Sequence, residues 1–580
     1  MERCGDRRRR RDPSVYAAET DRSGGGLLRS SDRRGRHLAH RSGQRSGRRG
    51  VRRVSVLTPV HDPPIPALLE CLDSAQRQTY PNCEHVLVDD GSTSVEVRSV
   101  LERAAALPGV VHLRLEPNRG IAAASNAALQ AATGDVVALL DHDDLLHPRA
   151  IERVVAPFAD PGVDYVYTDE DVITADGRRV DPFYKPAWSP ERFRNQMYTC
   201  HLSALRRSTV DRVGGFRSEL DGSQDWDLVL RVTEQGGTVV HVPEVLYHWR
   251  VVPGSVLAGE HVKPYAYVAA RRALEEHATR VGIDAEVVEQ HRRGYFHLRR
   301  RHRSHPLVSI VIPTRGSTGT VWGLSRTMVV EAVRSVVERS TWPNLEFVVI
   351  FDRSTPESVV EDVLELGGGR VVPVRWDRPF DFSAECNLGA SVARGEYLVF
   401  LNDDVEVVDD DWIEVLVGFA REPDVGAAGL RLLFEDGRIQ HAGHVHLNGN
   451  PGHLMFGQSP ESDRNRMALS LDREVAGVTA ACLGIRRSVF AEVGGFSAQF
   501  PNNYNDVDLC LKLRSVGYRI VVSAQASLYH FESMSRDPTV GSTELQRLRD
   551  RWLVELRSDP YYNPSYGDSF DNYPLPLRYP

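Results

Sequence analysis

The 580-residue sequence lacks the cysteine patterns of zinc modules and of secreted disulfide-bonded domains. Its seven cysteines are scattered, and no two are separated by only two residues. This spacing argues against a structural zinc site and against a disulfide framework. We therefore expect a chain that works in a reducing compartment, which predicts a cytoplasmic location.

The sequence also lacks long apolar runs and a strong net charge. No apolar run approaches the length of about 20 residues that crosses a bilayer. The basic N-terminus is not followed by the apolar segment of a secretory signal. The net charge of -8 gives no overall indication of nucleic-acid binding. The length predicts more than one domain, and the 41% of hydrophobic residues suffices for sizeable cores.

The first fifty residues differ from the rest in being crowded with Arg, Gly and Ser, including the run from Arg7 to Arg11. Such a segment buries too little apolar surface to fold, so we predict a disordered basic leader at 1–50. An arm that contacts anionic lipid or nucleic acid is the alternative. We favour the plain leader and expect no nucleic-acid partner.

Apolar runs that end in carboxylates are the main feature of the folded part. Val136–Leu140 is followed by Asp141, His142, Asp143 and Asp144, and an earlier run ends at Asp89 and Asp90. Helical segments alternate with these runs, which predicts a mostly parallel sheet with ligands bound beyond the carboxyl ends of its strands.

The clustered acids indicate a metal site. Carboxylates that repel one another are costly to hold together unless a cation lies among them. Mg²⁺ is commonly bound by one or two carboxylates plus substrate phosphates. The cluster therefore predicts a metal that holds a phosphorylated ligand, and the alternative is an acidic loop that caps the next helix.

The whole pattern occurs twice. The following segments repeat in the same order: Val54–Pro59 as Val308–Pro313, Val86–Ser92 as Val348–Ser354, Gly134–Asp143 as Gly395–Asp404, Val213–Phe216 as Val493–Phe496, Gln224–Arg231 as Asn505–Lys512, and Leu246–Trp249 as Leu528–Phe531. The spacing drifts little, so we predict a tandem duplication of an α/β domain of about 250 residues. The predicted domains are 51–260 and 306–540, joined by a helical and basic linker at 261–305 and followed by a C-terminal helix and tail at 541–580.

Both halves resemble family 2 glycosyltransferases of the GT-A fold, which are inverting enzymes that use nucleotide-sugar donors. The resemblance extends from Arg53 to Arg536. It rests on the opening strand with Pro59 or Pro313, the strand that ends in Asp-Asp-Gly-Ser, the acidic cluster and the later Asp-x-Asp-Leu block. It is greatest to bacterial enzymes that build O-antigen, rhamnan and similar surface polysaccharides, in which Tyr-Thr-Asp-Glu-Asp and Gln-Asp-Trp-Asp-Leu are familiar segments.

The resemblance implies a role for individual residues. It implies Mg²⁺ or Mn²⁺ as the cofactor, with the metal ligands Asp141, Asp143, Asp404, His248 and His530. It implies Asp225 and Asp506 as the general bases, and it places Pro59, Asp89, Asp90, Pro313 and Asp352 at the nucleotide. Asn402 replaces the first acid of the cluster in the second half, which removes a charge there, and Arg353 replaces Gly91, so that turn must differ.

Several side chains keep two interpretations. Asp227 and Asp508 are expected to serve the helix N-terminus rather than the reaction. Trp188, Trp226 and Trp249 either stack on sugars or pack in the core. His441 and His444 occur only in the second half and are expected to line an acceptor groove. No third ligand accompanies them in the sequence, so no zinc is implied.

The resulting hypothesis is a glycosyltransferase with two active sites. It would move sugars from nucleotide-sugar donors to a growing, lipid-linked surface glycan, with peripheral contact at the inner face of the plasma membrane. One catalytic module with one glycan-binding or scaffold module is the alternative. A nucleic-acid binder that uses the Arg-rich arm is a third, non-enzymatic alternative. A nucleotidyltransferase is less favoured, because no Gly-rich, Lys-bearing phosphate loop follows the first strand.

Overall fold

The computed structural model describes residues 52–174, 176–251, 264–461, 468–531 and 542–567. The described residues belong to one compact unit, Val51–Pro580. The predicted basic leader and the last part of the predicted tail lie outside the described residues. Within the described ranges, no helix combines the length and apolar character that a membrane span requires.

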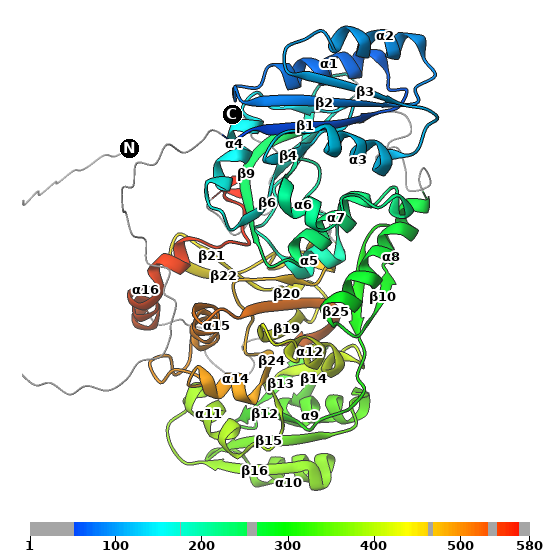
Figure 1. Ribbon diagram of the computed structural model, residues 1–580. Coiled ribbons are helices and arrows are strands. Elements are labelled where there is room, and N and C mark those ends of the chain that lie inside the picture. Colours follow the sequence, from blue (N-terminus) through cyan, green and yellow to red (C-terminus); the bar gives the residue numbers. More distant parts are fainter. Residues whose placement is uncertain (1–51, 175, 252–263, 462–467, 532–541, 568–580) are drawn as a thin grey trace, which may run out of the picture. The chain divides into compact units, whose positions relative to one another are not determined.

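The first half forms one mixed sheet (Figure 1). Its strands are β1 (Val54–Val60), β2 (Cys83–Asp90), β3 (Val110–Leu115), β4 (Val136–Leu139), β5 (Leu145–Leu146), β6 (Val163–Ile173), β7 (Arg179–Phe183), β8 (Ser203–Arg206) and β9 (Thr238–Arg250). The strand order is β3-β2-β1-β4-β8-β6-β9-β5, with β7 on β6. Strands β1 to β4 run parallel, and β8 pairs antiparallel with both β4 and β6.

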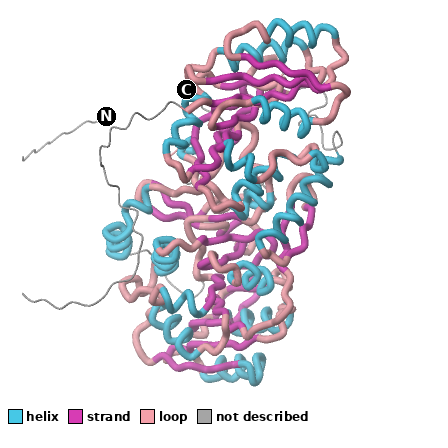
Figure 2. The backbone as a smooth tube through the Cα atoms, viewed as in Figure 1, coloured by secondary structure: helices cyan, strands magenta, loops and turns pink. Residues whose placement is uncertain are grey.

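Helices flank the strands of this sheet (Figure 2). They are α1 (Ile65–Gln76), α2 (Val95–Ala104), α3 (Ile121–Ala131), α4 (Ala150–Val155), α5 (Pro190–Asn195), α6 (Arg207–Arg212) and α7 (Gln224–Thr233). Side chains alternate between the two faces of a strand. Val54 and Val56 of β1 therefore pack with α1 and α4, whereas Leu57 packs with α3 and α7. Apolar runs in β1 and β4 thus reflect burial on both faces.

The connector contains more than the predicted helix. Helix α8 (Pro264–Val281) corresponds to the amphipathic pattern, but the basic stretch after it forms a hairpin of β10 (Ala285–Glu289) and β11 (Phe296–Arg300). Phe296 and Leu298 are buried on one face of β11. The surrounding arginines and histidines concealed this two-residue alternation in the sequence.

The second half repeats the strand order of the first sheet and has one strand more. Its strands are β12 (Val308–Thr314), β15 (Leu345–Asp352), β16 (Val371–Trp376), β17 (Tyr397–Leu401), β18 (Val405–Val407), β19 (Val425–Leu433), β20 (Ile439–His441), β23 (Arg473–Glu474), β24 (Cys482–Arg486) and β25 (Arg519–His530). Their order is β16-β15-β12-β17-β24-β19-β25-β18, with β20 on β19 and β23 on β25. This confirms the predicted α/β fold with two sheets of the same design.

The second half adds two small hairpins, β13 (Thr318–Val321) with β14 (Leu324–Thr327) and β21 (His444–Leu447) with β22 (Asn450–His453). Its helices are α9 (Met328–Arg339), α10 (Glu357–Gly367), α11 (Phe382–Val392), α12 (Trp412–Ala420), α14 (Arg487–Glu492), α15 (Asn505–Ser515) and the C-terminal α16 (Ser542–Arg557). Helix α16 covers the segment 543–556 for which the sequence predicts a helix.

Candidate functional site

A cavity of about 700 Å³ lies at the carboxyl ends of β1, β2 and β4. Four of the predicted acids line it together: Asp90, Asp141, Asp143 and Asp225. Pro59 lines it as well. These acids come from segments far apart in the sequence, and the parallel strand order brings them to one edge of the sheet.

The neighbouring acids Asp89 and Asp90 have different surroundings. The Asp89 carboxylate is buried, accepts the N–H of Ser92 at 2.8 Å and forms an ion pair with Arg114. It is not among the residues that line the cavity. Asp89 therefore holds the turn after β2 rather than facing a ligand.

Asp90 lines the cavity and also organises its edge. Its two oxygens accept the backbone N–H groups of Arg119 at 2.8 Å and Gly120 at 2.9 Å, at the start of α3. Gly91 follows with φ +67°, and a Cβ there would lie 2.6 Å from the backbone nitrogen of Asn118. The Asp-Gly pair thus permits the close approach of two loops at the mouth of the cavity.

The acidic cluster after β4 divides between cavity and core. Asp141 and Asp143 line the cavity. Asp144 is buried and accepts the Tyr247 hydroxyl and the Arg250 N–H, both at 2.7 Å. Burial, reinforced by the charge of Asp141, raises the pKa of Asp144 well above its ordinary value. Asp144 is an internal anchor for the loop.

Two acids in the first turn of α7 face opposite ways, because residues two apart on a helix differ by about 200°. Asp225 lines the cavity, and burial together with the nearby charge of Asp141 raises its pKa. Asp227 is fully buried and forms ion pairs with Arg217 and with Arg231, the latter at 2.6 Å. Asp227 thus lies outside the cavity, as expected, but it pairs with arginine side chains rather than with the backbone N–H groups of the helix N-terminus.

The Leu-Tyr-His segments of β9 and β25 do not occupy the same position in the two halves. The N–H groups of Leu146 and Val407 each donate to a serine hydroxyl of the first helix in their half, at 3.2 Å, so these two residues correspond. Leu146 pairs with Tyr247, and Val407 pairs with Leu528. Tyr247 therefore corresponds to Leu528, one residue away from the sequence match of Leu-Tyr-His. Strands β9 and β25 contain no insertion relative to each other: Thr238 and Tyr247 pair with Val163 and Glu170, just as Arg519 and Leu528 pair with Val425 and Leu432. The Leu-Tyr-His match is therefore displaced by one residue from the structural correspondence.

His248 is thus not the counterpart of His530, and the structure does not bring it to the acids of the first cavity as predicted for a metal ligand. A slip of one residue turns a side chain to the other face of the sheet. The buried His248 ring contacts Asp171, with 2.6 Å between Nδ1 and Oδ1, and does not line the cavity. Trp249 stands where the second half has His530, and it lines the cavity.

The imidazole in the first cavity comes instead from His201, which the sequence analysis missed. Its Nδ1 lies 3.0 Å from Oε2 of Glu170, and its ring centroid is 4.4 Å from that of Trp249. Burial alone lowers the pKa of His201, but the carboxylates of Glu170, Asp144 and Asp141 together raise that pKa to about 9. The first cavity therefore contains an imidazolium near neutral pH.

The second half has a smaller cavity, of about 260 Å³, in the same position. Pro313, Asn402, Asp404, Asp506 and His530 line it. The Nε2 atom of His530 lies 3.1 Å from Nδ2 of Asn402 and 3.3 Å from Oδ1 of Asp404. The structure thus places His530, unlike His248, beside the acid predicted to hold the metal.

The other acids of the second half repeat the division of the first only in part, because Asp352 differs from its counterpart Asp90. Asp352 accepts the backbone N–H of Ser354 at 2.8 Å and does not line the cavity. Asp508 is buried and accepts the Trp552 indole N–H at 2.8 Å. Asp506 lines the cavity and accepts the N–H of Val507 at 2.8 Å.

The two halves take their imidazole from different strands. Arg207 and Arg487 make the same hydrogen bond, from N–H to the carbonyl of the residue before β4 or β17, so they correspond. Counting back six residues, His201 corresponds to Ala481. One half therefore combines His201 with Trp249, and the other combines Ala481 with His530. Comparing the halves residue by residue would have found this exchange.

Of the remaining aromatic and histidine residues considered in the sequence analysis, some line a cavity and others do not. Trp226 is buried in the core, and its indole N–H donates to a backbone carbonyl at 3.0 Å, whereas Trp249 faces the cavity. His444 lines the second cavity, as expected for this groove, but His441 does not. A third histidine that the sequence analysis did not associate with them, His453, lies beside both.

The family model described as glycosyl transferase family 2 matches residues 55–214 and 309–494, once in each half. Among curated proteins, the chain is 38% identical over 528 residues to the uncharacterized protein y4gI of Sinorhizobium fredii. It is 36% identical over 524 residues to the O-antigen biosynthesis protein RfbC of Myxococcus xanthus. Each match covers 88% of this chain but only 57% and 40% of the two relatives.

A solved structure with partial similarity is the mannosyltransferase PcManGT of Pyrobaculum calidifontis, in complex with GDP-Man and Mn²⁺. It is 23% identical and covers 40% of this chain and 74% of its own, with a TM-score of 0.30. A TM-score this low supports no argument about the site.

Proposed function

The chain belongs to glycosyl transferase family 2, and on this premise we propose an inverting, metal-dependent transfer of sugars from nucleotide-sugar donors to a growing cell-surface polysaccharide. The acceptor in this proposal is a lipid-linked glycan. The relationship to a protein of O-antigen biosynthesis supports the substrate class. Because the chain spans about half the length of these relatives, the proposal concerns the reaction of this chain alone.

One observation supports the reaction most directly: Asp90, Asp141, Asp143 and Asp225 line the same cavity. Asp141 and Asp143 offer the oxygen ligands that Mg²⁺ or Mn²⁺ prefers. When bound there, such a cation would act as a Lewis acid on the leaving diphosphate. Asp90 keeps the loop before α3 in place beside the nucleotide.

In the proposed step, Asp225 acts as the general base. An acceptor hydroxyl oxygen forms the new bond to the anomeric carbon as the bond to the diphosphate oxygen breaks. The hydroxyl proton passes to the Asp225 carboxylate, and attack from the face opposite the leaving group inverts the configuration. The raised pKa of Asp225 brings it nearer the working pH, which suits a base.

The test uses the full chain with Asp225→Asn and Asp506→Asn made separately and together. Nucleoside diphosphate release and sugar transfer are measured over a panel of nucleotide sugars with Mg²⁺ or Mn²⁺. Loss of a different linkage in each single variant is the expected result for two active sites. Unchanged formation of every linkage in either single variant would contradict them.

A second candidate function is a chain with one catalytic half and one glycan-binding half. Differences between the second site and the first favour it. Its cavity is smaller, and Asn402 replaces an acid. Glu385, buried with its pKa raised by burial to about 7, takes the position of Ala124, which lines the first cavity. Metal-dependent protection by a donor against thermal unfolding separates the candidates. Protection abolished by Asp143→Asn and unaffected by Asp404→Asn would favour the single-site candidate.

A further inference from the structure

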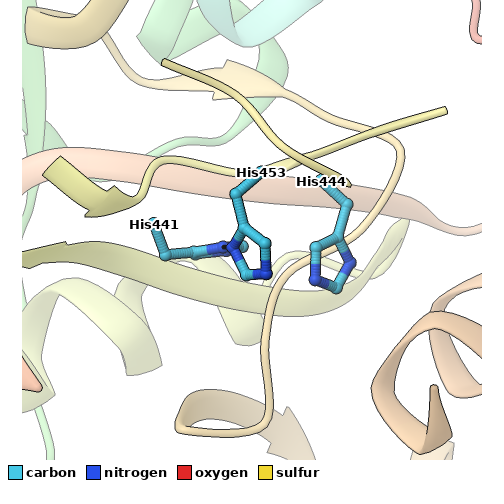
Figure 3. Close-up of side chains that lie close together, drawn as sticks. All are labelled: His441, His444 and His453. Atoms are coloured by element: carbon cyan, nitrogen blue, oxygen red, sulfur yellow. Dashed lines mark hydrogen bonds between the residues drawn. The ribbon is translucent and has the colours of Figure 1, made fainter. Parts of the chain in front are cut away.

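Three histidine side chains of the second half converge on one point (Figure 3). His441 ends β20, His444 begins β21 and His453 ends β22. Each offers one ring nitrogen, and these three nitrogens all lie within 4.8 Å of one another. His441 and His444 are buried, and His453 is partly buried.

A tight turn creates the cross-strand pair. Asn448 and Gly449 have φ of +52° and +80°, the positive values of a two-residue type I′ hairpin turn. The strand pairing that follows from this turn places His444 of β21 directly opposite His453 of β22. Opposite residues of an antiparallel pair have neighbouring side chains, so a sequence separation of nine residues becomes a contact.

A second turn adds His441. Gly443 has φ +97°, and a Cβ there would lie 2.5 Å from a methyl carbon of Val475, so this turn requires glycine. The turn brings the ring of His441 to 5.1 Å from that of His444 and 4.9 Å from that of His453, measured between centroids.

The arrangement is close to that of a metal site with three imidazole ligands. Zinc–nitrogen bonds of about 2.0–2.1 Å in tetrahedral geometry separate ligand nitrogens by roughly 3.3 Å. The Nδ1 atoms of His441 and His453 are 2.8 Å apart, so small ring rotations suffice. Burial lowers the pKa of all three imidazoles, that of His453 to about 3, which leaves them neutral, the form that binds metal.

A second group of potential ligands in the chain, Glu170, Cys200 and His201, shows the contrast. There the buried ammonium of Lys185 lies 3.2 Å from Glu170 and bonds to the carbonyl of Cys200. The carboxylate of Glu170 is thus already paired with the Lys185 ammonium. The three-histidine group has no carboxylate member, so its ligand set is imidazole alone.

We propose that His441, His444 and His453 bind a divalent cation of the zinc class. Three protein ligands leave a fourth position, as in zinc sites that bind water or a substrate. His444 and His453 line the same cavity as Asp404 and Asp506, and Oδ2 of Asp506 lies 4.0 Å from Nε2 of His444. The fourth position therefore opens toward the predicted general base of the second half.

This site differs in ligand chemistry from the carboxylate cluster. Imidazole nitrogens favour Zn²⁺, Co²⁺ or Ni²⁺, whereas carboxylates favour Mg²⁺ and Mn²⁺. One contact opposes ligation: the Thr479 N–H donates to Nε2 of His441 at 3.2 Å, which favours a proton on Nδ1. Binding at Nδ1 moves that proton to Nε2 and gives up this hydrogen bond.

The test uses the full chain, stripped with a chelator and titrated with Zn²⁺ and with Co²⁺ in the absence of nucleotide. One equivalent of Zn²⁺ and the visible absorption of tetrahedral Co²⁺ are expected. His453→Gln should weaken Zn²⁺ binding by at least about 100-fold. His446→Gln is the matched control, since this buried histidine is on the same hairpin but outside the cluster.

Asp404→Asn separates this site from the carboxylate cluster and should leave Zn²⁺ binding intact. Thermal unfolding checks that each variant is folded, and the stoichiometry and Co²⁺ spectrum of the unaltered chain are decisive without variants. No bound Zn²⁺, equal losses in His446→Gln and His453→Gln, or loss in Asp404→Asn would overturn the proposal. The first outcome would leave a hydrogen-bonded histidine chain in place of a metal site.

Discussion

Two acids in the first turn of α7 allow a paired test, because one lines the cavity and the other forms ion pairs in the core. Asp225 faces the cavity, and Asp227 pairs with Arg217 and Arg231 in the core. Replacement by asparagine keeps the shape of either side chain but removes its charge. We expect Asp225→Asn to lower turnover without unfolding the protein, and Asp227→Asn to lower stability.

The expected magnitudes follow from these surroundings. Loss of a general base costs about 10²–10⁴-fold in rate, which is roughly 3–5 kcal/mol in the barrier. Breaking a buried ion pair costs about 3–5 kcal/mol of stability. Arg217 also pairs with Glu276 and is 25% exposed, so the lower end of that range applies to Asp227→Asn. At about 2–4 °C per kcal/mol, the melting temperature would fall by roughly 6–12 °C.

The assay compares donor turnover and thermal unfolding for both variants in an Asp506→Asn background, so that only the first site contributes. Donor binding, followed as protection against unfolding, should survive Asp225→Asn because the residue is proposed to act on the acceptor. The reasoning fails if Asp227→Asn abolishes turnover at an unchanged melting temperature, or if Asp225→Asn keeps full turnover.

Other predictions concern side chains whose positions the fold determines. His530→Ala should weaken metal-dependent donor protection at the second site, whereas His248→Ala should lower the melting temperature and leave donor protection at the first site unchanged; the opposite pattern would contradict the assignment of Trp249 as the counterpart of His530. The carboxylates of Glu170, Asp144 and Asp141 raise the pKa of His201 from 6.5 to about 9, so their stabilisation is complete below pH 6.5 and is lost as pH rises through about 9. Unfolding midpoints against pH should show this loss, and Glu170→Gln should reduce it. Gly91→Ala should cost about 1–3 kcal/mol of unfolding free energy in denaturant titrations, and an unchanged midpoint would refute the close loop approach.

Corresponding positions in the two halves do not have equivalent surroundings. Asn402 in the second half contacts His530, whereas the first half has an acid at that place and its imidazole from His201. The duplicated sheets share one strand order, but the side chains that line the two cavities differ. The cavities of the two halves, which lie at the same position of the fold, therefore differ in charge and in volume.

Much of the site could be predicted from local pattern. Short apolar runs specify strands, and the chain alternates these runs with helices, so acids after β2 and β4 meet at the carboxyl edge of a parallel sheet. In the structure, Asp90, Asp141 and Asp143 line one cavity at this edge. The turn Asn448–Gly449 also carried a readable hairpin signal, and applying its register would have paired His444 with His453.

Sequence by itself determined the duplication, the α/β architecture and the edge at which the acids gather, because these depend on periodicity and strand order. Only the tertiary structure decided which of two adjacent side chains faces the cavity. Asp90 rather than Asp89, and Trp249 rather than His248, face it, because successive side chains of a strand point to opposite faces and the pairing of the strands decides which face borders the cavity. That pairing joins segments far apart in the sequence, so the order of residues along one strand does not reveal it.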